Sequence, residues 1–129
     1  METSLFIAAG TGAVAAMLVG GLWYSPLLFG NAWKRLAHVS SEADSDPVVT
    51  YGGAFALLCL AALVFGAFVG SDPTLEFALG AGASAGIAWA AGSLWISYLF
   101  EGRSFKLGLI NGGYHIVQFT LFGLCFAIL

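Results

Sequence analysis

Three polar side chains stand on one face of an otherwise apolar segment near the C-terminus. Asn111, His115 and Gln118 are spaced i, i+4 and i+7, which brings them onto one side of an α-helix. Histidine can gain and lose a proton near neutral pH, so one interpretation is a polar track for a small solute or a proton. The alternative is interhelical hydrogen bonding, which contributes about 0.6–2 kcal/mol per contact in membranes. Either interpretation keeps this face away from lipid.

A second group of candidate residues lies in two similar motifs, each with a serine two residues after a tryptophan. Because the motifs lie toward the same side of the membrane as the polar face, their hydroxyls and indoles are its predicted partners. Together with the polar face, they give the predicted substrate-binding set: Trp23, Tyr24, Ser25, Trp95, Ser97, Tyr98, Asn111, His115 and Gln118. Most Trp and Tyr residues fall near the same ends of the predicted helices, and only Trp89 lies deep within one. They form either an interfacial aromatic belt or an aromatic vestibule around the two motifs.

The residue patterns of common catalytic and metal sites are not found in this sequence. There are two histidines, and His38 falls in a predicted loop, far from His115. No acid lies in the middle of a predicted helix, and we find no nucleophile–base pair, phosphate-binding glycine loop or basic array for nucleic acid. We therefore expect no enzymatic activity, no cofactor, no metal and no nucleic-acid partner.

The composition is that of an integral membrane protein. Of 129 residues, 60% are hydrophobic and 9% charged, whereas a soluble domain carries about 25% charged residues. The charges cluster, which leaves four apolar stretches of roughly 20 residues or more, enough to cross a hydrocarbon core of about 30 Å. The predicted membrane helices are 4–24, 48–70, 74–98 and 107–129. Cys59 and Cys125 lie inside two of them, so we expect packing residues rather than a disulfide.

Three prolines mark element boundaries. Asp46-Pro47 and Asp72-Pro73 each offer an N-cap acid followed by proline at the first helical position, so they predict the starts of the second and third helices. Ser25-Pro26 either begins a short interfacial helix that runs to Arg35 or kinks the end of the first helix.

The chain repeats itself at an offset of 72 residues. The frame Trp-x-Ser-x-Leu-x-x-Gly-x-x-x-Lys occurs at 23–34 and again at 95–106. A weaker match at an offset of 60 pairs Tyr51-Gly52-Gly53 with Asn111-Gly112-Gly113. Because a hairpin crosses the membrane twice, both copies enter it in the same sense.

The predicted fold is an all-α polytopic membrane protein with one transmembrane domain over residues 1–129. Its four transmembrane helices form two parallel tandem hairpin repeats, 1–70 and 73–129, with a pseudo-twofold axis along the membrane normal.

Small residues recur at i, i+4 in both copies, at Ala8, Gly12, Ala16 and Gly20 and at Gly80, Ser84, Ala88 and Gly92. Such stripes let backbones approach closely in lipid, so we expect the first and third helices to cross at the axis, with the others outside. Gly66 and Gly70 form a further pair that could serve the fold or a dimer.

Two segments carry a family resemblance, GLWYSPLLFG at 21–30 and YLFEGR at 98–103, the latter followed by NGGYH at 111–115. They resemble the two signatures of a family of small bacterial membrane proteins, the domain of unknown function numbered seventeen sixty-one. The resemblance covers nearly the whole chain. It implies four membrane helices and a bacterial origin, and it assigns no activity and no catalytic residues.

Two classes of function fit these features. The first is a transporter or channel for a small solute, assembled as a homo-oligomer and most simply a dimer, because four thin helices enclose little volume alone. The second is an accessory or assembly subunit of a larger membrane complex with no transport activity of its own. Besides the lipid bilayer, the expected partner is a second copy or that complex. A polar face lining a water-filled cavity would favour transport, and a packed interior would favour the accessory role.

Basic residues near helix ends predict the topology. All four fall in the first and third loops: Lys34, Arg35, Arg103 and Lys106. The positive-inside rule places these loops in the cytoplasm and both termini outside the bacterial inner (plasma) membrane.

Cysteine labelling at Ser41 and Ser71 should find the first cytoplasmic and the second external. The reverse labelling pattern would contradict this orientation.

Overall fold

The structure, a computed structural model, describes residues 2–38 and 46–129, and the elements in these ranges are all helical. The elements are α1 (Glu2–Trp23), α2 (Gly30–Ala37), α3 (Pro47–Val69), α4 (Leu75–Ser84), the π-helical segment η1 (Ala85–Ala91), α5 (Gly92–Glu101) and α6 (Phe105–Ile128). In the described ranges, four helices are long and apolar enough to cross a membrane: Thr3–Trp23, Pro47–Val69, Leu75–Glu101 and Phe105–Ile128. The all-α class and the four predicted spans are thus confirmed.

The predicted span ends lie within three residues of the observed ones. The largest difference is at the third span, which continues to Glu101 rather than ending at 98. It ends there because Gly102 adopts a left-handed conformation with φ of +67°, which glycine tolerates. Ser41, the labelling position in the first loop, lies outside the described residues.

Side-chain caps start the second and third spans. Asp46 accepts a hydrogen bond from the Val48 amide at 2.9 Å, with Pro47 at the first helical position, as predicted. The prediction for Asp72 is wrong, because Thr74 caps α4 and its hydroxyl accepts from the Phe77 amide at 3.2 Å. Asp72 instead has a φ of +47° and belongs to the turn before the cap.

The Ser25-Pro26 segment is a turn rather than the first turn of a helix or a kink within one. Helix α1 ends at Trp23, and α2 begins at Gly30. The amide of Gly30 donates to the Ser25 carbonyl at 2.9 Å, which closes the turn. A Cβ atom at Gly30 would overlap the carbonyl oxygen of Tyr24, so only glycine fits where the chain folds back. The short helix expected here therefore exists, but it starts four residues after Pro26.

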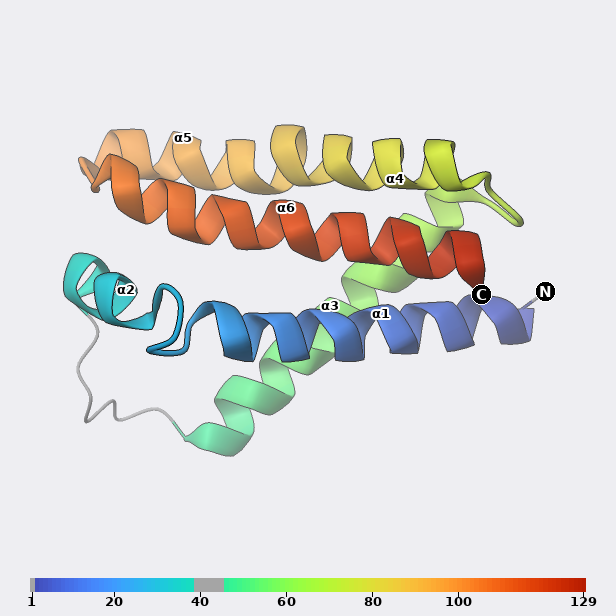
Figure 1. The fold of residues 1–129 in the computed structure, drawn as a ribbon, viewed down its shortest axis with the longest axis horizontal. Coiled ribbons are helices and arrows are strands. Elements are labelled where there is room, and N and C mark those ends of the chain that lie inside the picture. Colours follow the sequence, from blue (N-terminus) through green and yellow to red (C-terminus); the bar gives the residue numbers. More distant parts are fainter. Residues whose placement is uncertain (1, 39–45) are drawn as a thin grey trace.

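Helix α6 occupies the centre of the bundle (Figure 1). It packs against α4 and η1 on one side and against α1 on another, while α3 crosses behind α1 and meets α6 less extensively. The expectation that the first and third spans cross as the central pair is therefore wrong. The reason is close backbone contact between the third span and α6. A Cβ atom at Gly82 would overlap the carbonyl oxygen of Phe119, and one at Gly123 would overlap that of Ala78.

The two small-residue stripes do not face the same way. In α1 the stripe is turned toward α6, because Gly12 lies against the Phe122 ring and Gly20 against the Tyr114 ring. In the third span Gly80, Ser84 and Ala88 are exposed, and Ala78, Gly82 and Gly86 are buried in their place. Of the Gly66 and Gly70 pair, Gly66 serves the fold, since it packs tightly against Phe126 and Leu5, whereas Gly70 faces open space.

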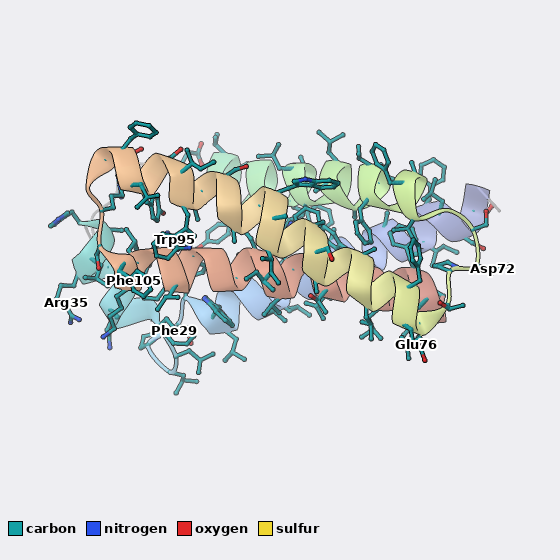
Figure 2. All side chains as sticks on the ribbon, turned by 90° about the horizontal axis from the view of Figure 1, so that it is seen from above. Phe29, Arg35, Asp72, Glu76, Trp95 and Phe105 are labelled. Carbon is teal, nitrogen blue, oxygen red and sulfur yellow. The ribbon has the colours of Figure 1, made fainter. Side chains whose placement is uncertain are left out.

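The spans alternate in direction, so α1 and α4–α5 run the same way and the two termini lie at one end of the bundle (Figure 1). Figure 2 shows Arg35 and Phe105 at the opposite end from Asp72 and Glu76. The loop between α3 and α4 therefore lies at the opposite end of the bundle from Arg35, and the orientation of the bundle in the membrane stays a prediction.

Substitution of Gly82 tests the backbone contact. Gly82→Val should lower the free energy of unfolding by about 1–3 kcal/mol, because the added atoms overpack against Phe119. The matched control is Gly80→Ala on the same helix, where a Cβ meets nothing within 4 Å. It should raise stability by about 0.5–1 kcal/mol through helix propensity. Unfolding in detergent, followed by circular dichroism, measures both, and equal effects would contradict the contact.

Candidate functional site

An amide held between two tyrosines ties three parts of the chain together. The Tyr24 hydroxyl donates to Asn111 Oδ1 at 2.7 Å, and Asn111 Nδ2 donates to the Tyr98 hydroxyl oxygen at 2.7 Å. Tyr24 lies in the turn after α1, Tyr98 in α5 and Asn111 in α6. Burial raises the pKa of Tyr24, and the neighbouring Tyr114 and Tyr98 add to the rise, so its hydroxyl stays neutral and can donate.

Both tryptophans of the repeated motifs pack on glycines of α6. Trp23 Nε1 donates to the Ile110 carbonyl at 2.9 Å, and a Cβ atom at Gly113 would come within 3.1 Å of the Trp23 ring. The Trp95 ring lies against Gly108 and Gly112 in the same manner, with its centroid 4.9 Å from that of Phe105 (Figure 2). The two indoles thus meet one helix, and neither covers Gly52 or Gly53 of α3.

Tyr114 forms an aromatic layer with Tyr24 and Trp33 at this end of the bundle. Its hydroxyl donates to the Ala16 carbonyl at 2.9 Å, which ties α6 to α1. The Tyr24 ring lies between Tyr114 and Trp33, with centroid separations of 5.7 and 4.9 Å. The layer therefore joins α1, α2 and α6 through ring contacts as well as hydrogen bonds.

His115 and Gln118 pair with each other on the polar face. His115 Nδ1 lies 2.8 Å from Gln118 Oε1, which can only accept, so in this arrangement Nδ1 carries the proton. Gln118 is 5% exposed, while Asn111 and His115 are half-buried. The second ring nitrogen of His115 makes no hydrogen bond within residues 2–38 and 46–129.

The predicted partners of this face are brought together in part. Tyr24 and Tyr98 bond Asn111, and Trp23 and Trp95 pack on the same helix. The two serines do not take part. Ser25 donates to the Leu22 carbonyl of its own turn at 2.6 Å, and Ser97 is exposed.

Sequence reasoning missed several residues that build the site. Sequence reasoning placed Tyr114 only among the aromatic residues near the helix ends. It used Gly112 and Gly113 only to align the repeat. A tryptophan in one span and a glycine pair at the same depth in another is a signal that could have found this packing. Arg103 served in the topology prediction but not as a site residue: its guanidinium lies 5.5 Å from the Tyr98 ring centroid and pairs with Glu101 at 2.7 Å.

Two clefts lie elsewhere on the molecule. One, of about 400 Å³, lies near the termini and is lined by Ser4, Gly66 and Phe126 among others. The other, of about 530 Å³, separates α3 from α4 and η1 and is lined largely by apolar side chains such as Phe65 and Trp89. Asn111, His115 and Gln118 line neither cleft. The described residues contain no group of three metal-ligating side chains placed to hold an ion.

Comparisons with known proteins give the family. No curated protein and no solved structure matches the chain. A family model described as Protein of unknown function (DUF1761) matches residues 7–127. That match covers almost the entire sequence and includes both aromatic motifs and the polar face. The chain therefore belongs to this family of proteins of unknown function.

Proposed function

We propose that this protein is a non-enzymatic accessory or assembly subunit of a larger membrane complex. The observation that carries the proposal is the pairing of its polar groups. Among the described residues, no buried side-chain nitrogen or oxygen lacks a hydrogen-bond partner. Asn111 uses both its oxygen and its nitrogen on two tyrosines, which holds the amide in one orientation between them.

The position of the hydrogen bonds supports a structural role. They join the turn after α1, the end of α5 and the first half of α6 at one membrane boundary. A site that carries a solute must exchange its contacts during transport, whereas contacts that fix helix ends are kept. An accessory subunit needs a rigid shape that a partner can recognise, and this network supplies one.

One observation favours a second role, transport of a proton or small solute. His115 is half-buried within a membrane span, and its Nε2 is unpaired within the described part of the chain. An ionisable group at such a position is a candidate for a proton pathway. In this role the chain acts as a homo-oligomer, and the aromatic layer forms the entrance.

We also propose that one hairpin was duplicated to give residues 1–70 and 73–129, related by a pseudo-twofold axis along the membrane normal. The shared Trp-x-Ser frame and the common direction of α1 and α4–α5 support this origin. We propose the bacterial inner membrane as its location, and the loop bases support an orientation with both termini outside.

The structural role predicts a stability loss on removal of the central amide. Asn111→Leu leaves the Tyr24 and Tyr98 hydroxyls without their partner, and it should lower the free energy of unfolding by about 1–2 kcal/mol. Ser97→Ala, at an exposed position on α5, is the control and should change stability by less than about 0.5 kcal/mol. Thermal unfolding in detergent measures both, and an unchanged midpoint for Asn111→Leu would remove the basis of the proposal.

Proton flux separates the two roles. Proteoliposomes with an internal pH-sensitive dye and an imposed potassium diffusion potential should show no flux above that of empty liposomes if the protein is an accessory subunit. Tagged protein from native membranes should then copurify with another membrane protein. Flux in the wild type that His115→Ala abolishes without lowering the unfolding midpoint would instead establish transport.

A further inference from the structure

The first half of α3 is not covered by any other described part of the chain. Every residue from Pro47 to Leu57 is exposed. The helix is anchored only beyond this segment, where Leu58, Ala62 and Phe65 are buried at 8%, 0% and 7% exposure. Figure 1 shows α3 diverging from the other helices toward its N-terminal end.

The aligned segment of α6 has the opposite environment. At the offset of 60, residues 47–57 correspond to 107–117, and within 107–117 only Leu109 is exposed. Gly112 and Gly113 lie against the Trp95 and Trp23 rings, whereas a Cβ at Gly52 or Gly53 would meet nothing within 4 Å. One copy of this helix is therefore covered by protein, and the other is bare.

Exposed apolar side chains alone need no protein partner, because lipid tails solvate them as well as another helix does. The glycine pair is different. Two glycines weaken a helix, and in a membrane their usual gain is a close approach of another backbone or ring. On α6 this close approach is observed, because a tryptophan ring packs against each of Gly112 and Gly113. On α3 the glycines still lack the ring that would make use of them.

We propose that this segment of α3 binds the same segment of a second copy of the chain, around a twofold axis along the membrane normal. Tyr51 is 65% exposed and adjoins Gly52, so each copy carries both an aromatic ring and a glycine pair. In a twofold interface, the ring of one copy covers the glycines of the other, as the indoles do on α6.

A second copy meets the other requirements of the surface. It enters the membrane in the same direction, so its Tyr51 lies at the same depth as the glycines it must cover. The segment 47–57 has no charged side chain, so no like charges meet along it when two copies approach. The inference goes beyond the proposed function, because it holds for an accessory subunit and for a transporter alike.

Gly52→Leu/Gly53→Leu tests the interface without disturbing the fold, since both positions face open space within the chain. The matched control is Gly21→Leu, which also faces open space and lies in α1 near the same membrane boundary.

Full-length protein labelled with donor and acceptor dyes is reconstituted in liposomes at a series of protein-to-lipid ratios. Energy transfer should indicate dimers for the wild type and Gly21→Leu. The double variant should associate at least tenfold more weakly, and Tyr51→Ala should weaken association in the same direction. All variants should keep the wild-type helix content and unfolding midpoint.

Three outcomes would overturn the proposal. The first is a wild type that stays monomeric at every ratio, and the second is a double variant that associates as tightly as the wild type. The third is tested by oxidative crosslinking in native membranes, where Gly53→Cys should give a disulfide-linked homodimer and Gly21→Cys should not. Absence of that homodimer would overturn the proposal. A crosslink to a different protein would assign the surface to another partner.

Discussion

Backbone contact between α6 and the third span is the constraint on which the rest of the structure depends. In lipid, apolar side chains gain little by leaving their solvent, so helices are held by packing and by hydrogen bonds. Gly82, Gly86 and Gly123 bring the two backbones together over several turns. Once α6 is fixed there, its other sides carry the remaining contacts, with α1 through Phe122 and Tyr114 and with α3 through Phe126. The central place of α6 follows from these few glycines.

The amide between Tyr24 and Tyr98 closes one end of this arrangement. Asn111 could not stay unpaired inside a membrane span, because an unsatisfied amide in hydrocarbon costs several kcal/mol. Its two hydrogen bonds tie the turn after α1 and the second half of α5 to α6. Toward the other end the helices are packed by phenylalanines, with Phe65 near Phe119, Phe122 and Phe126. The two ends are therefore held by different kinds of force.

The sequence was sufficient for the four spans, because charged residues bound them and an apolar stretch of this length has few alternatives in a membrane. It predicted the cap at Asp46 but not the one at Thr74, since both an acid and a hydroxyl stood near Pro73. It placed Tyr24 and Tyr98 among the partners of Asn111 through their shared depth. It could not place α6 at the centre, because Gly80 and Gly82 look alike in a sequence. Which of them is buried depends on helix rotation, a property of the whole bundle.

The π-helical segment η1 changes the rotation of the third span along its length. Its wider turns, with i→i+5 hydrogen bonds, accommodate an additional residue relative to an α-helix. Residues on its two sides are therefore out of phase with their counterparts in α1, which is α-helical throughout. Each residue turns an α-helix by about 100°. If Ala85–Ala91 closed into a regular α-helix with the same residues, α5 would turn about its axis by roughly this angle, taking Trp95 off Gly112 and Tyr98 off Asn111. The wide turns of η1 thus couple a point in the middle of the third span to the polar cluster at its end, and they allow two hairpins of equal residue spacing to present different faces to a shared helix.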